Sequence, residues 1–212
     1  MALAGCGGRL SERPSDSSRH GLHEVTPTED LMFEHGLIVR LLLIYNEAVR
    51  RIEVDDGISP ELIFRVANLI RMFSEDYHEK NEEQYVFPRL KQADLHGELV
   101  DTLRIQHDRG RTLTDHIRFM AHQQPVDFKA LTKAMQAYNF MYVAHISREN
   151  SVIFRAFHRL LPEHEYMELG ETFEQQENKH LAGKGFEGIL SEVIDLEVKL
   201  DIHDLNIYTP VH

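Results

Sequence analysis

A histidine followed four residues later by a glutamate occurs twice in the sequence, at His78 with Glu82 and at His145 with Glu149. Side chains four positions apart lie on the same face of a helix. Each pair can therefore offer an imidazole nitrogen and a carboxylate oxygen to one metal centre. The repeated pair predicts a metal site.

Two further histidines, His35 and His107, lie in two other apolar stretches. His35 and His78 lie about 17 and 18 residues from the turn between the first two predicted helices, and His107 and His145 lie about 16 to 18 residues from the turn between the last two. At 1.5 Å rise per residue an up-down bundle therefore brings all four to nearly one height. Independent core histidines have no reason to align, and burying two carboxylates without a cation is costly. We therefore expect a dinuclear, carboxylate-bridged site. Its predicted metal ligands are His35, His78, Glu82, His107, His145 and Glu149.

Four amphipathic segments must position these residues. Thr26, followed by a proline and by Glu29, predicts a capping box that opens a helix running to about residue 52. Ser59 and the proline after it predict a second cap, on a helix that passes Glu82 and ends near Pro88 or shortly after. The third helix is expected from about residues 94–97 to 122.

Asp127 is the predicted N-cap of the fourth helix, which ends at Pro162. The fold class predicted is all-α: an up-down-up-down four-helix bundle with a C-terminal helical extension. Its domains are a disordered arm at residues 1–25, the bundle at 26–162 and the extension at 163–212.

The extension carries a helix over residues 163–180 and an amphipathic helix over about 186–200. It acts as a lid, as a buttress, or as the contact of a homodimer, and the sequence leaves these alternatives open. If it folds back, Glu177 and His180 could reach over the site. Glu79 and Glu83 point about 100° away from the paired ligands, either beside them or into solvent.

The composition excludes several partners. The net charge is -12 with histidine neutral, and no Lys/Arg cluster forms a basic stripe, so we expect no nucleic acid and no anionic membrane. No run of 18 apolar residues occurs. Cys6 is the single cysteine, so the chain can build no disulfide framework and no cysteine-based metal site, and a cytoplasmic location is the default.

The motifs around the predicted ligands resemble those of the hemerythrin-like proteins with an HHE cation-binding domain, over roughly residues 27–162. They are Glu34-His35-Gly36, His78-Glu79-Lys80-Asn81-Glu82-Glu83 leading to Phe87-Pro88, Gln106-His107-Asp108-Arg109-Gly110-Arg111, and His145-Ile146-Ser147-Arg148-Glu149-Asn150 with Val152-Ile153-Phe154.

This resemblance implies a non-haem site of two iron ions, joined by an oxo or hydroxo bridge, with the four histidines as terminal ligands and Glu82 and Glu149 as bridges. Imidazole and carboxylate donors suit iron, and zinc or manganese also fits them. The ligand expected at the open position is a small diatomic molecule or a peroxide.

Two departures from the oxygen-carrying hemerythrins bear on function. Carriers have a second histidine where this chain has Arg111, and an aspartate five residues after the last histidine where it has Glu149 at four. Reaction with oxygen, peroxide or nitric oxide, in scavenging, stress response or iron-centre repair, is therefore favoured over reversible carriage. If the protein is an enzyme, it is a di-iron oxidoreductase of peroxidase, catalase-like or nitric-oxide-handling type. The alternatives are a sensor or an oxygen- or iron-binding module without turnover.

Overall fold

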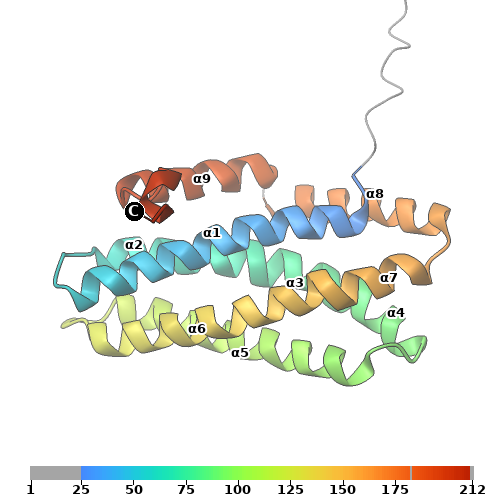
Figure 1. Ribbon diagram of the computed structural model, residues 1–212, viewed down its shortest axis with the longest axis horizontal. Helices are drawn as coiled ribbons and strands as arrows, with labels where there is room; N and C mark the ends of the chain where they lie inside the picture. Colours follow the sequence, from blue (N-terminus) through green and yellow to red (C-terminus); the bar gives the residue numbers. More distant parts are fainter. Residues whose placement is uncertain (1–24, 182, 211–212) are drawn as a thin grey trace, which may run out of the picture.

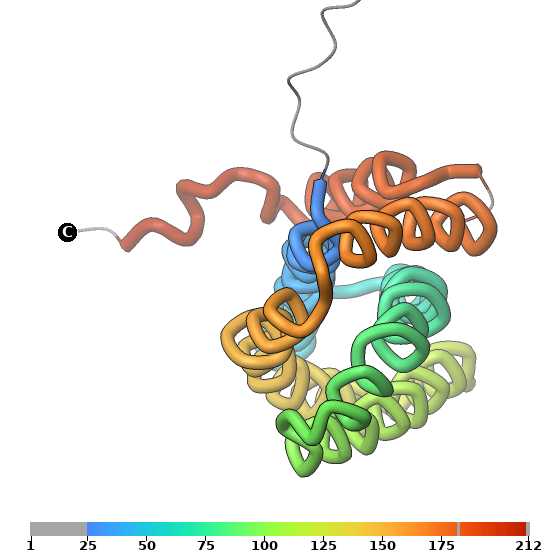
Figure 2. The backbone as a smooth tube through the Cα atoms, turned by 90° about the vertical axis from the view of Figure 1, so that its right-hand side faces the viewer, coloured from blue at the N-terminus to red at the C-terminus, as the bar shows by residue number. Residues whose placement is uncertain are grey.

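The computed structural model describes residues 25–181 and 183–210, and within these residues the chain forms helices and no strands. Four long helical segments run side by side along the long axis of the molecule (Figure 1). Seen along that axis, they surround a common centre (Figure 2). The predicted all-α, up-down-up-down four-helix bundle is confirmed. The predicted arm at residues 1–25 lies, apart from Val25, outside the described residues.

Each long segment is continuous, although the second and fourth contain several elements. The elements in chain order are α1 (Pro27–Glu53), α2 (Pro60–Leu69), a π-helical stretch (Ile70–His78), α3 (Glu79–Asn81), a second π-helical stretch (Glu82–Val86), α4 (Phe87–Gln92), α5 (Gly97–Ala121), α6 (Phe128–Arg148), a third π-helical stretch (Glu149–Ile153), α7 (Phe154–Leu160), α8 (Glu163–His180), α9 (Gly185–Lys199) and a short 3-10 turn (Leu205–Tyr208).

Two of the three predicted N-caps form as expected. The Thr26 hydroxyl accepts from the backbone N–H of Glu29, and the Glu29 carboxylate accepts from the backbone N–H of Thr26, 3.0 Å away, which closes the capping box. The Asp127 carboxylate accepts from the backbone N–H of Ala130 at 2.9 Å. The cap predicted at Ser59 is wrong, because the Ser59 side chain makes no capping hydrogen bond. The backbone oxygen of Ser59 instead accepts from the backbone N–H groups of Leu62 and Ile63, at 3.0 and 3.4 Å.

The π-helical stretches were not predicted from the sequence, whose periodicity was interpreted as α-helical. In a π-helix the backbone hydrogen bonds reach five residues back, so each turn holds more residues than an α-helical turn. The stretches Ile70–His78, Glu82–Val86 and Glu149–Ile153 lie where the His–Glu pairs occur. The direction in which neighbouring side chains point therefore changes at the predicted site.

The hydrophobic core consists of two clusters with a polar layer between them. One cluster includes Leu41, Ile70, Ile117 and Tyr138, and extends to residues of α9. The other includes residues of α4, the start of α5, α7 and α8, among them Phe154. The predicted ligands occupy the positions between these clusters on all four helices, so the bundle brings them to one height.

The C-terminal helices pack on the bundle as a buttress. Figure 1 shows α8 and α9 along the outside of α1. Arg40 of α1 forms an ion pair with Glu197 of α9 at 2.6 Å, and Arg51 donates to the backbone oxygen of Leu200 at 2.7 Å. No helix in the described part of the chain has the length and apolar character needed to cross a membrane.

Candidate metal centre

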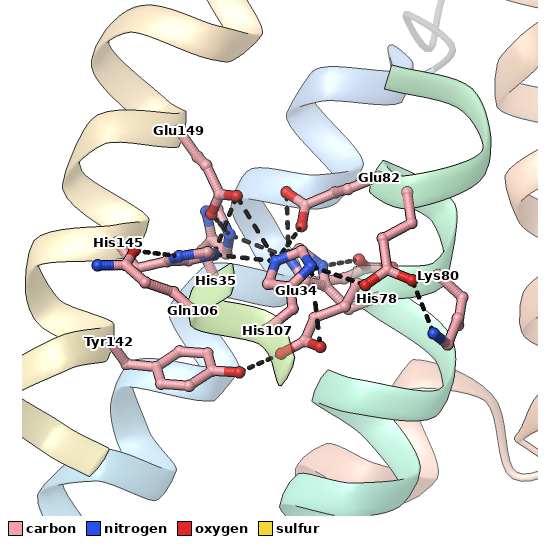
Figure 3. A network of polar contacts seen from close by, with 12 residues as sticks. Glu34, His35, His78, Lys80, Glu82, Gln106, His107, Tyr142, His145 and Glu149 are labelled. Carbon is pink, nitrogen blue, oxygen red and sulfur yellow. Dashed lines mark hydrogen bonds and ion pairs between the residues drawn. The ribbon is translucent and has the colours of Figure 1, made fainter. Parts of the chain in front are cut away.

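All six predicted ligands converge in the polar layer. Each is no more than 3 % exposed. Ligand atoms of two sets lie within 4.8 Å of one another: one set from Glu82, His107, His145 and Glu149, the other from His35, His78 and Glu82. Figure 3 shows the two glutamates pointing from their separate helices toward the histidine rings.

The histidines form two pairs. The Nε2 atoms of His35 and His78 are 3.0 Å apart, and those of His107 and His145 are 3.1 Å apart. Two nitrogens bound to one metal at about 2.1 Å and about a right angle are separated by about 3 Å. Each pair therefore has the spacing of two ligands on a single ion.

The other ring nitrogen of each histidine faces an oxygen that only accepts hydrogen bonds. These contacts are His35 Nδ1 to Asn150 Oδ1 at 2.7 Å, His78 Nδ1 to Glu34 Oε2 at 2.6 Å, His107 Nδ1 to Glu83 Oε1 at 3.0 Å and His145 Nδ1 to Gln106 Oε1 at 2.9 Å. Each Nδ1 must then carry the proton, which leaves a lone pair on each Nε2. Two facing lone pairs repel unless a cation lies between them.

Each glutamate places one oxygen near each histidine pair. Glu82 Oε1 lies 3.6 Å from His78 Nε2, and its Oε2 lies 3.4 Å from His107 Nε2. Glu149 Oε2 lies 3.4 Å from His35 Nε2, and its Oε1 lies 3.0 Å from His145 Nε2. This is the arrangement of two carboxylates that bridge two ions.

None of these four buried carboxylate oxygens has a hydrogen-bond donor. Buried polar atoms without partners are rare in folded proteins, and a buried carboxylate without a counter-charge is costly. The donor set therefore fits a pair of cations, which would satisfy the four oxygens and the four facing nitrogens together.

The electrostatics of the layer point the same way. Burial lowers the pKa of His107 to about 4 and holds that of His78 well below its ordinary value, so both rings stay neutral, as metal ligation requires. Burial and the adjacent Glu149 raise the pKa of Glu82 well above its ordinary range. Burial acts to raise the pKa of Glu149 too, but the neighbouring His145 and His35 outweigh it and hold that pKa low.

The glutamates beside the ligands lie inside the protein, so the alternative that they point into solvent is wrong. Glu79 is 1 % exposed, and Glu83 accepts from His107 and Lys80. Arg111 Nη2 lies 2.7 Å from Glu79 Oε2 and 2.6 Å from Glu83 Oε1. The other predicted alternative, that both glutamates lie beside the ligands, agrees with these contacts.

Of the four residues that orient the histidines, only Glu83 was considered from the sequence, as one that lies either beside the ligands or in solvent. Glu34, Gln106, Glu83 and Asn150 each sit next to a predicted ligand in the sequence, yet each bonds to a histidine of a different helix. A polar residue next to each of His35, Glu82, His107 and Glu149 is the signal that could have found them.

Within the described residues, the extension provides no ligand atom to the groups that could hold a metal. His180 is exposed, and Glu177 Oε1 accepts from the backbone N–H of Phe186 at 2.9 Å. The suggestion that these two residues reach over the site is therefore wrong.

Fold and site together define a class: helical bundles whose core holds a metal centre built from histidines and bridging carboxylates. Within this class the chain matches the hemerythrin HHE cation-binding domain over residues 26–157, which is more than half of its length. The protein belongs to the hemerythrin HHE cation-binding family.

The relatives extend beyond this domain. Uncharacterised proteins of Mycobacterium bovis and Mycobacterium tuberculosis are 39% identical to the chain over an alignment of 219 positions, which covers 99% of this chain and 85% of each relative. The likeness therefore includes the C-terminal helices. No solved structure matches the chain significantly.

Proposed function

We propose that the protein is a non-haem di-iron protein whose reduced centre reacts with oxygen, peroxide or nitric oxide. The observation that carries this proposal is the set of four buried carboxylate oxygens without donors, facing two pairs of Nε2 atoms. In this assignment His35 and His78 hold one iron, His107 and His145 hold the other, and both glutamates bridge them.

The donor count supports a reactive centre. Two imidazole nitrogens and two carboxylate oxygens give each iron four protein bonds, and iron accommodates six. Arg111 adds no further ligand, because its guanidinium group pairs with Glu79 and Glu83. Both ions would therefore keep positions for water, oxygen or peroxide, and iron bound there supplies the electrons for the reaction.

The chain's own residues keep the donors in place. Four oriented histidines, each fixed through Nδ1, keep their lone pairs directed at the metals. The aromatic rings of Phe154 and Phe87 stack on His35 and His107 with centroids 5.3 and 5.5 Å away, and they cover the centre from the side of the second core cluster.

We predict that the di-ferrous protein is oxidised irreversibly by oxygen. A carrier must release oxygen before superoxide or peroxide escapes from the centre, whereas open positions on both ions, accessible to water, favour net oxidation. Stopped-flow mixing of anaerobic di-ferrous protein with oxygen tests this, with an oxidised spectrum that persists under argon as the expected result. A long-lived visible band that disappears when oxygen is removed would mean that the protein is a carrier.

A further inference from the structure

Tyr142 lies one helical turn before His145 on α6, with its ring centroid 5.3 Å from the imidazole. The side chain is 2 % exposed, and its hydroxyl donates a short hydrogen bond to Glu79 Oε1. Figure 3 shows the phenol directed from α6 toward the helix that carries His78. The metal centre therefore has a buried phenol beside it, and that phenol has a defined proton acceptor.

The neighbouring helix leaves room for this phenol. A Cβ atom at Gly110 of α5 would lie 2.7 Å from the Tyr142 hydroxyl oxygen and 2.9 Å from its Cε2. Glycine inside a helix is less favourable than alanine. The contact gives this helix-interior glycine a physical role, because any other residue would push the phenol away from Glu79.

Two more buried tyrosines, Tyr138 and Tyr45, lie in a row beyond Tyr142, but their hydroxyls have no hydrogen-bond acceptor. Tyr138 stacks on Tyr142 with centroids 4.2 Å apart and planes at 13°, and Tyr45 meets Tyr138 edge-on at 6.0 Å. The hydroxyls of Tyr138 and Tyr45 have no hydrogen-bond partner. A phenol loses an electron readily only when its proton leaves as well, since the phenol radical cation is a strong acid. Among these three tyrosines, only Tyr142 is hydrogen-bonded to a carboxyl group, that of Glu79, whose other oxygen lies 2.7 Å from Arg111 Nη2.

We propose that Tyr142 is redox-active: it gives one electron to the metal centre while its proton moves to the Glu79 carboxylate. This inference rests on the proposed function, with hydrogen peroxide as the oxidant. Peroxide needs two electrons and two protons to become two waters. A centre with one ferrous iron, held by these ligands, would supply one of the two electrons and be left fully ferric. Tyr142 gives the other and becomes a neutral radical, and solvent provides the two protons.

The test is electron paramagnetic resonance of the iron-loaded, half-reduced full chain, frozen shortly after one equivalent of hydrogen peroxide is added. We expect a tyrosyl radical whose hyperfine splitting collapses when the protein contains ring-deuterated tyrosine. Tyr142→Phe keeps the ring and the stacking and removes only the hydroxyl, and it should abolish the signal. Tyr138→Phe, and Tyr166→Phe in the other core cluster, are matched controls that should retain it. Iron content and circular dichroism equal to wild type confirm that each variant is folded and loaded.

The outcomes separate this inference from the proposed function. Iron oxidation without a radical in wild type, or a radical that survives in Tyr142→Phe, would overturn the role of Tyr142 alone. No oxidation of the iron by peroxide would overturn both. Gly110→Ala gives an independent reading, because displacement of the phenol should weaken the signal or change its hyperfine pattern while the Tyr142 hydroxyl is still present.

Discussion

Glu82→Ala and Glu149→Ala should each bind far less iron than Glu83→Ala. A bridging carboxylate gives one oxygen to each ion, so its loss removes a bond from both and leaves the facing imidazoles without their shared anion. Glu83 instead orients His107 through Nδ1 at 3.0 Å, and losing such an orienting group weakens metal binding about 10- to 100-fold. Iron titration of the anaerobic apo-proteins, with binding followed by isothermal calorimetry, measures the difference.

Glu165→Ala is the matched control for the loss of one carboxylate, because Glu165 lies on α8 and its only described ion pair is a long one, to Arg89 at 3.8 Å. It should bind iron as wild type does. If Glu83→Ala proves the most damaging of the variants, the carboxylate that faces the metals belongs to Glu83, and the assignment of Glu82 as a bridge is wrong.

Metal removal should lower the stability of the protein strongly, and Glu82→Gln should reverse part of that loss. A ligand at about a thousand times its dissociation constant stabilises the native state by about 4 kcal/mol, which raises the Tm of a chain of this size by about 10 °C. Wild-type protein should therefore show a large rise in Tm with ferrous iron under anaerobic conditions. Glu82→Gln should show little, because an amide cannot bridge two cations as a carboxylate does.

Without metal, the stability of Glu82→Gln relative to wild type should increase as the pH rises. The raised pKa of Glu82 means that the folded apo-protein binds a proton more tightly than the unfolded chain, so its contribution is present at low pH and is lost as pH rises through the raised value. Glu82→Gln has no such proton to lose. Its free energy of unfolding relative to wild type should therefore increase from pH 5 to pH 8 in chelator.

Glu83→Gln is the control with the opposite sign. Burial acts to raise the pKa of Glu83, but His107, Lys80 and Arg111 outweigh it and lower that pKa well below its ordinary value. Glu83 therefore stabilises the fold above its ordinary pKa, and Glu83→Gln should destabilise the apo-protein at pH 8. Urea unfolding of the two variants side by side decides the matter. If Glu82→Gln changes the free energy of unfolding equally at pH 5 and pH 8, the pKa of Glu82 is not raised in the folded apo-protein.

The helices and the height of the ligands could be predicted from local rules. Proline and capping residues mark where α1 and α6 begin, and the four-residue spacing puts each histidine on the same face as its glutamate. The rise of 1.5 Å per residue then brings the four histidines to nearly one height. These arguments need only distances along one chain segment, so the sequence contains them.

The orientation of side chains within the polar layer could not be predicted in the same way. The stretches Ile70–His78 and Glu82–Val86 are π-helical, whereas the periodicity of the sequence was interpreted as α-helical. The Nδ1 acceptors come from neighbouring helices, so their partners depend on tertiary structure. The ion pairs of Arg111 likewise join α5 to the second helix.

The most direct test of the metal centre is iron analysis of anaerobically reconstituted protein, followed by anomalous diffraction at the iron edge. We predict two irons per chain, one between His35 and His78 and the other between His107 and His145, with both glutamates bridging. Glu79, Glu83 and His107 form a second group whose ligand atoms lie within 4.8 Å of one another. A single ion held by that group, or no anomalous density in the polar layer, would contradict the assignment.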